Sequence, residues 1–96
     1  MTRKVIACVV IKNDERFIPD LVKSLRGNVN GLIVLANHTS QNTSISYIFD
    51  RSCILYDVPL LEFMFDEKTN MSNLRNKLIL ATRKFGECYV LMITLS

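Results

Sequence analysis

The feature that most constrains this chain is an unbroken apolar run at residues 5–11, Val-Ile-Ala-Cys-Val-Val-Ile. The run is rich in β-branched side chains and does not alternate between polar and apolar residues, which predicts a strand covered on both faces. Such strands belong to parallel sheets, whose crossover connections place helices over the sheet. We therefore expect residues 5–11 to form the first, central strand of an α/β sheet.

Helical and strand patterns alternate along much of the remaining chain. Residues 17–25 carry apolar side chains at helical spacing and are followed by Gly27, a typical helix stop. Residues 32–35 predict a second short buried strand. Residues 70–85 again repeat apolar side chains at three- and four-residue steps before Gly86, and the apolar residues 89–93 predict the last strand.

The middle of the chain is the hardest part to assign. Thr43 is placed to cap a short helix whose apolar residues are Ile45, Ile48 and Phe49. Residues 53–56 predict a third strand at the edge of the sheet, whereas the apolar residues 60–65 fit a strand or an irregular connection. Three right-handed β-α-β crossovers then give a three-layer α/β/α, Rossmann-like fold with a mostly parallel four-stranded sheet in the order 3-2-1-4.

Composition bounds the class of protein. Ninety-six residues make one domain, and 49% hydrophobic against 22% charged residues is typical of a packed core. No apolar run approaches the roughly 20 residues of a membrane-spanning helix. The net charge of +3 comes from dispersed basic residues, which argues against a nucleic-acid partner. Cys8, Cys53 and Cys88, each in or beside a predicted strand and without Cys-x-x-Cys spacing, indicate reduced core thiols in a cytoplasmic protein.

Residues 70–96 carry a resemblance to a known family. Ser72, Arg75 and Asn76 match the Ser-Ala-Ala-Arg-Asn-like motif that opens a helix near the end of the nucleotide-binding half of family 2 glycosyltransferases of the GT-A fold. The chain therefore resembles the N-terminal, nucleotide-sugar-binding half of these enzymes. The resemblance implies that Arg75 offsets the charge of a sugar-nucleotide diphosphate.

Two further loops resemble the same family. Ile11 to Glu15, Ile-Lys-Asn-Asp-Glu, is similar to the family turn that passes beneath the nucleotide base and ribose, which implies contacts from Ile11, Lys12, Asn13 and Glu15. The alternative is that Asn13, Asp14 and Glu15 only cap a helix. Asn37 stands in the loop that in the family reads the base, but Ala36 replaces the family's base-reading aspartate.

The chain departs from the family most clearly after the last strand. The family places an Asp-x-Asp motif there, whose carboxylates hold Mn²⁺ or Mg²⁺ against the diphosphate, and this chain has Thr94, Leu95 and Ser96. Neutral hydroxyls are weak ligands for such cations, so the metal-binding acids are missing. The only histidine, His38, has no serine, acid or cysteine partner at motif spacing, and we assign no catalytic residue.

The prediction from sequence is a single glycosyltransferase-like domain, residues 1–96, truncated or degenerate, that binds a nucleotide-sugar of the UDP-sugar type without transferring it. If active, it would transfer a hexosyl group. The expected binding residues are Ile11, Lys12, Asn13, Glu15, Asn37, Arg75, Thr94 and Ser96. The alternative is a non-catalytic protein-interaction module on the same scaffold, self-associating as a homodimer through an edge strand or pairing with a missing C-terminal half.

Overall fold

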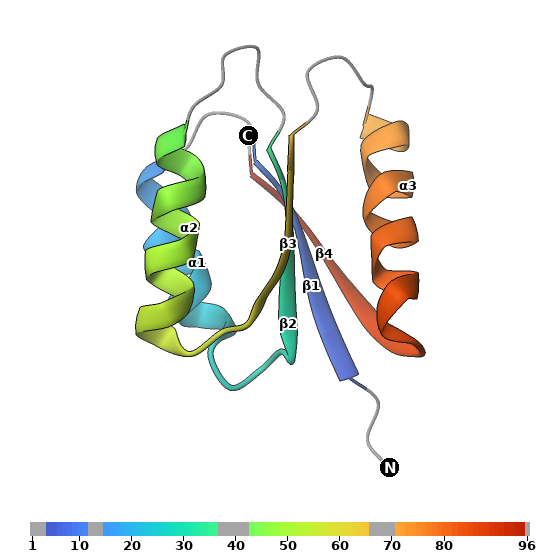
Figure 1. The fold of residues 1–96 in the computed structure, drawn as a ribbon, viewed down its shortest axis with the longest axis horizontal. Helices are drawn as coiled ribbons and strands as arrows, with labels where there is room; N and C mark the ends of the chain where they lie inside the picture. The colour runs from blue at the N-terminus through green and yellow to red at the C-terminus, as the bar shows by residue number, and fades with distance from the viewer. Residues whose placement is uncertain (1–3, 12–14, 37–42, 66–70, 96) are drawn as a thin grey trace.

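The computed structural model of this chain describes residues 4–11, 15–36, 43–65 and 71–95. These residues form three layers, in which a four-stranded sheet lies between α1 and α2 on one face and α3 on the other (Figure 1). All strand pairs are parallel, and the strand order is β3-β2-β1-β4. The predicted fold class and strand order are therefore confirmed.

The first half of the fold follows the sequence pattern closely. Strand β1 (Lys4–Ile11) is fully buried from Ile6 onward, as the run without alternation predicts. A short 3₁₀ turn, η1 (Glu15–Phe17), leads into α1 (Ile18–Leu25), and β2 (Gly31–Ala36) follows. Helix α1 ends at Leu25. Gly27 follows two residues later with a φ of +76°, in the left-handed region that glycine adopts without steric cost.

The prediction of a strand at residues 53–56 is wrong, because helix α2 (Thr43–Tyr56) continues through them. Ile45, Phe49 and Cys53 recur at four-residue steps and are all buried, so one helical stripe extends across the assumed boundary. Ile54 and Leu55, the two residues after Cys53, are 82% and 71% exposed, as expected for the outer side of the same helix. Cys53 is therefore a helical residue and does not lie in or beside a strand.

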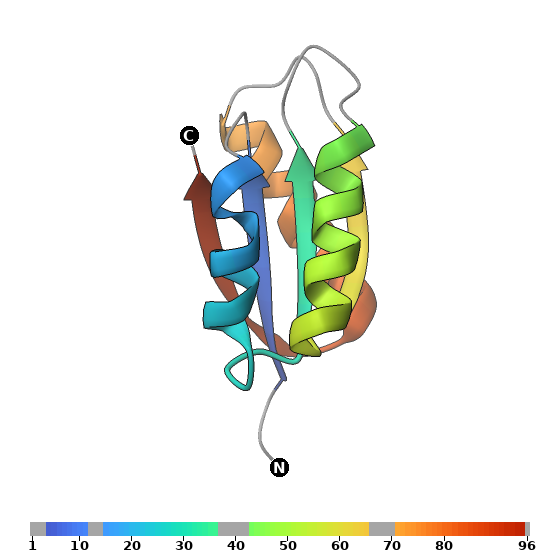
Figure 2. The same cartoon turned by 90° about the vertical axis from the view of Figure 1, so that its left-hand side faces the viewer.

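The third strand is β3 (Leu60–Phe65), the segment that the sequence pattern left open. Its pairing with β2 shifts register between Leu32 and Ile33, so that Leu61 is an extra residue in the ladder. Leu60 packs on the side of α1 and α2, and Leu61 packs on the side of α3. Strand β3 is one edge of the sheet and β4 (Cys88–Leu95) is the other (Figure 2).

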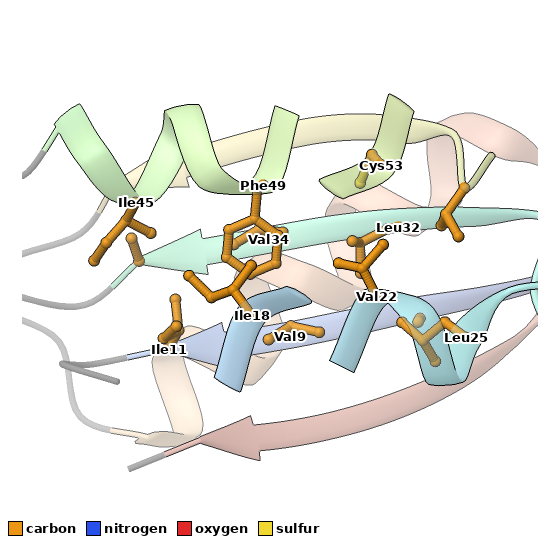
Figure 3. Close-up of a cluster of buried hydrophobic side chains, with 13 residues drawn as sticks. Val9, Ile11, Ile18, Val22, Leu25, Leu32, Val34, Ile45, Phe49 and Cys53 are labelled. Carbon is orange, nitrogen blue, oxygen red and sulfur yellow. The ribbon is translucent and has the colours of Figure 1, made fainter. Parts of the chain in front are cut away.

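Helix α3 (Met71–Thr82) and the short turn η2 (Arg83–Phe85) connect β3 to β4 across the second face. Leu74, Leu78 and Ala81 are buried on that face, which confirms the apolar stripe predicted there. On the opposite face α1 and α2 pack side chains onto β1 and β2 around Phe49 (Figure 3). The Phe49 ring meets Phe63 of β3 edge-on, with centroids 5.9 Å apart. No described helix is long and apolar enough to cross a membrane.

Candidate functional site at the carboxyl edge of the sheet

The carboxyl ends of the four strands are level. Ile11 pairs with Ala36 in β2 and with Leu95 in β4, and Ala36 pairs with Phe65 in β3. The chain segments that follow these four residues therefore all leave the sheet at the same edge. In open α/β sheets ligands bind outside this edge, because the loops that follow the strands converge there.

The adjacent strands β1 and β4 form the point where the topology of the sheet changes direction. From β1 the chain proceeds through β2 to β3 on one side, with α1 and α2 on one face, and then returns by α3 on the opposite face to β4 (Figure 1). In open α/β sheets such a switch point between adjacent strands is where ligands bind, beyond the carboxyl ends of the strands. Ile11 and Thr94 lie at this position.

The structure describes only some of the residues that the sequence predicts for this site. Lys12, Asn13, Asn37 and Ser96 lie outside the described residues, as does His38. Glu15 is the first residue of η1, and its side chain also lies outside the described part. Covalent connection nevertheless fixes where three of these segments start: Lys12 follows Ile11 in β1, Asn37 follows Ala36 in β2, and Ser96 follows Leu95 in β4.

Ile11 occupies this edge with its side chain turned into the core. It is fully buried among the apolar residues between the sheet and helices α1 and α2 (Figure 3). A ligand at the edge cannot reach this side chain, so any contact from Ile11 must come from its backbone. Ala36 is fully buried in the same way, and its methyl group offers no hydrogen bond to a base.

Arg75 is the predicted site residue that the structure places most completely. It lies in the fifth position of α3, and its exposed side chain stands next to the buried Leu74 that anchors this helix on the sheet. Helix α3 begins at the carboxyl edge, because it follows β3 (Figure 1). The guanidinium is thus free of the core and carries a permanent positive charge near the edge.

Thr94 is an exposed residue of β4 that pairs with Val10 of β1. Val10 belongs to the cluster on the α3 side of the sheet, so Thr94 shares that face. A single neutral hydroxyl does not fit a magnesium or manganese ion, which needs anionic oxygen ligands. Among the described residues no group of three or more histidine, cysteine, aspartate or glutamate side chains is placed to hold a metal ion.

The two buried cysteine thiols, Cys8 and Cys53, are unsuited to nucleophilic chemistry. Cys8 and Cys53 are buried, and Cys88 is half-buried. Burial raises the pKa of the Cys8 thiol from its usual 9.0 to about 11, with the nearby Cys88 adding to the effect. Burial and the carboxylate of Asp50 raise the pKa of Cys53 to about 11. Both thiols are therefore protonated at neutral pH, and they act as packing groups.

A groove of about 330 Å³ on the outer side of α1 and α2 was not foreseen from the sequence. Pro19, Tyr47, Arg51 and Leu55 are among the residues that line it. The Arg51 guanidinium donates a hydrogen bond to the Tyr47 hydroxyl at 2.7 Å and stacks 5.5 Å from the ring centroid. The sequence pattern predicts a strand at residues 53–56, which would remove Leu55 from the helix, so the groove does not follow from the sequence.

Comparisons with known proteins supply no relative: no protein-family model, no curated protein and no solved structure matches this chain.

Proposed function

We propose that this chain binds a nucleotide-sugar at the carboxyl edge of its sheet, beyond the ends of β1 and β4. The observation that carries the proposal is the level edge itself, at which the strand order β3-β2-β1-β4 brings together the starts of three segments that resemble nucleotide-binding parts of the family. The two most specific of these, Lys12 to Glu15 and Ser72 to Asn76, enter or leave this edge from different strands.

Arg75 is the proposed contact to the diphosphate. Phosphate oxygens carry the greatest density of charge in a nucleotide-sugar, and a guanidinium binds them through two parallel hydrogen bonds. The exposure of Arg75 and its place in the second turn of α3, near the helix start, support this role. The N-terminus of α3 faces the same edge and adds a partial positive charge.

Lys12, Asn13 and Glu15 are the proposed contacts to the base and ribose, with Asn37 approaching from the neighbouring loop. Their support is positional, since the β1 and β2 ends that lead into these segments lie side by side through the pairing of Ile11 with Ala36. Thr94 and Ser96 would border the diphosphate on the β4 side.

The proposal is binding without glycosyl transfer. Deprotonation of an acceptor hydroxyl needs a positioned carboxylate or histidine, and the resemblance supplies no such residue to this chain. The neutral Thr94 likewise supplies no charged ligand for a metal that would help a diphosphate to leave.

Isothermal titration calorimetry with UDP and UDP-sugars tests the proposal, with and without Mn²⁺. Arg75→Ala should weaken UDP binding at least about tenfold, or about 1.4 kcal/mol, because a hydrogen bond to a charged group is lost. Arg83→Ala is the matched control, since Arg83 is an exposed cation in η2 at the opposite end of α3. The absence of heat at millimolar ligand would refute small-molecule binding. An equal loss in both variants would show only non-specific attraction.

A protein-interaction module is the second candidate function, favoured by the exposed apolar side chains of the edge strand β4. Val90 and Leu91 are 38% and 45% exposed although they belong to a sheet strand. An edge strand of this kind binds a further strand through its backbone hydrogen-bonding groups. Titration of an uncharged, end-blocked strand peptide into the isotope-labelled chain should shift the amide signals of Val90 and Met92. Unchanged signals would remove this candidate.

A further inference from the structure

The two edges of the sheet differ in how they resist pairing with another strand. Strand β3 contains the register shift at Leu61 and the charged Glu62, whose carboxylate lies 3.5 Å from the Lys84 ammonium. Bulges and charges are the devices by which natural sheets block edge pairing. Strand β4 has neither: Cys88–Leu95 contains no charged residue and no proline, and it pairs with β1 in unbroken register.

The structure defines which backbone groups of β4 face outward. The Val5 carbonyl accepts a hydrogen bond from the Asn30 amide at 2.7 Å, and the Val5 amide donates to Asn30 Oδ1, so the backbone of Val5 faces β2. Backbone N–H and C=O groups of successive strand residues point to alternate sides, so those of Ile6 and Cys8 point toward β4. In a parallel pair, when the backbone groups of one residue point toward the partner strand, those of the residue directly opposite point away from it. The outward-facing residues of β4 are therefore those that pair with Lys4, Ile6, Cys8 and Val10, namely Cys88, Val90, Met92 and Thr94.

We propose that β4 pairs antiparallel with β4 of a second copy of this chain, about a two-fold axis at Leu91. The proposal rests on the second candidate function and specifies its partner. In this register Val90 lies opposite Met92 of the other copy, and Cys88 lies opposite Thr94. The four outward-facing residues thus pair among themselves, and each outward amide and carbonyl meets its complement.

Side-chain chemistry selects the second copy and this register. Since β4 carries no charge, self-pairing places no like charges opposite each other. A two-fold axis normal to the sheet keeps each face aligned, so it lies between the two copies of a single residue. Leu91 and Met92 are the positions nearest the centre of β4, where the two strands overlap most. The axis at Leu91 gives Val90 an apolar partner, whereas the axis at Met92 places Val90 opposite the hydroxyl of Thr94. Figure 2 shows β4 as the outermost described element on its side, with α1 lying over the sheet beside it.

Sedimentation equilibrium of the full chain is the first test. The expected mass is twice the monomer's 11.0 kDa at micromolar concentration. Leu91→Lys should weaken the dimer by about fivefold or more, because it sets two like charges against each other at the axis. Leu80→Lys, which makes the same change on the exposed side of α3, should leave the mass unchanged. A chain that is monomeric throughout, or a dimer whose dissociation constant is unchanged by Leu91→Lys, would overturn the proposal.

Disulfide trapping tests the register and does not depend on Leu91→Lys folding. Opposed residues that do not exchange hydrogen bonds have Cα atoms about 4.5 Å apart, within the range that a disulfide spans. In a Cys88→Ser background, Leu91→Cys should therefore form a covalent dimer under mild oxidation, and Met92→Cys should form at most about a tenth as much. Preferential trapping by Met92→Cys would overturn the register, and no trapping by either would overturn the dimer.

The strand-peptide titration separates this proposal from the function on which it rests. A monomeric chain whose Val90 and Met92 amides still respond to the peptide keeps an interaction edge and loses the second copy as its partner. A monomeric chain without that response loses both.

Discussion

Gly31→Ala tests the identification of β3 as the third strand. A methyl group on Gly31 would lie 2.8 Å from Leu61 Cγ and closer still to Leu61 Cδ1, well inside the 3.5–4.0 Å of ordinary carbon contacts. Because Cγ is near the base of the side chain, the whole isobutyl group must change rotamer. The cost of such overpacking is about 1–3 kcal/mol. Loss of unfolded-state entropy offsets about 0.4–1 kcal/mol of it, since Gly31 has no positive φ. We expect a net loss of about 1–2 kcal/mol in the free energy of unfolding.

A double-mutant cycle isolates this contact. In a Leu61→Ala background the added methyl group loses its three nearest contacts, all of them with Leu61, so Gly31→Ala should become neutral or stabilise the chain by up to about 1 kcal/mol. Leu60→Ala is the matched control: Leu60 precedes Leu61 in β3 but packs on the opposite face, so it should give no rescue. Urea unfolding followed by circular dichroism at constant m-value measures each free energy. Equal costs of Gly31→Ala in all three backgrounds would refute the pairing of β2 with β3.

Three further predictions concern the core, the thiols and the carboxyl edge. Phe49→Ala should destabilise the chain by about 3–5 kcal/mol in urea, since a fully buried ring is removed, and a loss below about 1 kcal/mol would contradict the packing of α2. The pKa values of Cys8 and Cys53, raised by burial to about 11, mean that the folded chain holds both protons more tightly than the unfolded chain. The contribution of these thiols to the free energy of unfolding should therefore be fully present below pH 9. It should fall by about 2–3 kcal/mol per thiol as the pH rises to about 11. Cys53→Ala should remove about half of this fall, and an undiminished fall would refute the assignment. Thr94→Asp combined with Ser96→Asp should create a Mn²⁺ site with a dissociation constant below about 1 mM, or about 4 kcal/mol, only when UDP is present. If calorimetry finds no metal-dependent gain in UDP affinity, the loops lack the family's shape.

The strand order and most elements could be predicted because their signals are local. An unbroken apolar run such as β1 identifies a strand covered on both faces, and the apolar stripe at Leu74, Leu78 and Ala81 identifies α3. Once four strands and their crossover helices are counted, the rule of right-handed connections leaves few topologies, and the order 3-2-1-4 is among them.

The boundary between α2 and β3 could not be read in the same way. Cys53 to Tyr56 is a short apolar run with β-branched and aromatic residues, and such a run is equally compatible with a strand and with the last turn of a helix. The structure places Cys53 on the buried side of α2 and leaves Ile54 and Leu55 exposed. Helix α2 ends at Tyr56, the next residue Asp57 has a φ of +57°, and Pro59 precedes β3.

For the candidate site too, some features follow from the sequence and others only from the tertiary structure. The sequence by itself determined which polar residues follow each strand, because the residues after Ile11, Ala36 and Leu95 are fixed by covalent connection. Only the tertiary structure decided that these strand ends are level and adjacent, since that depends on register between segments distant along the chain. It also decided that Ile11 turns its side chain into the core, and that Leu61 fills the space left by Gly31. Register and burial arise from packing between elements, and no local pattern of residues encodes them.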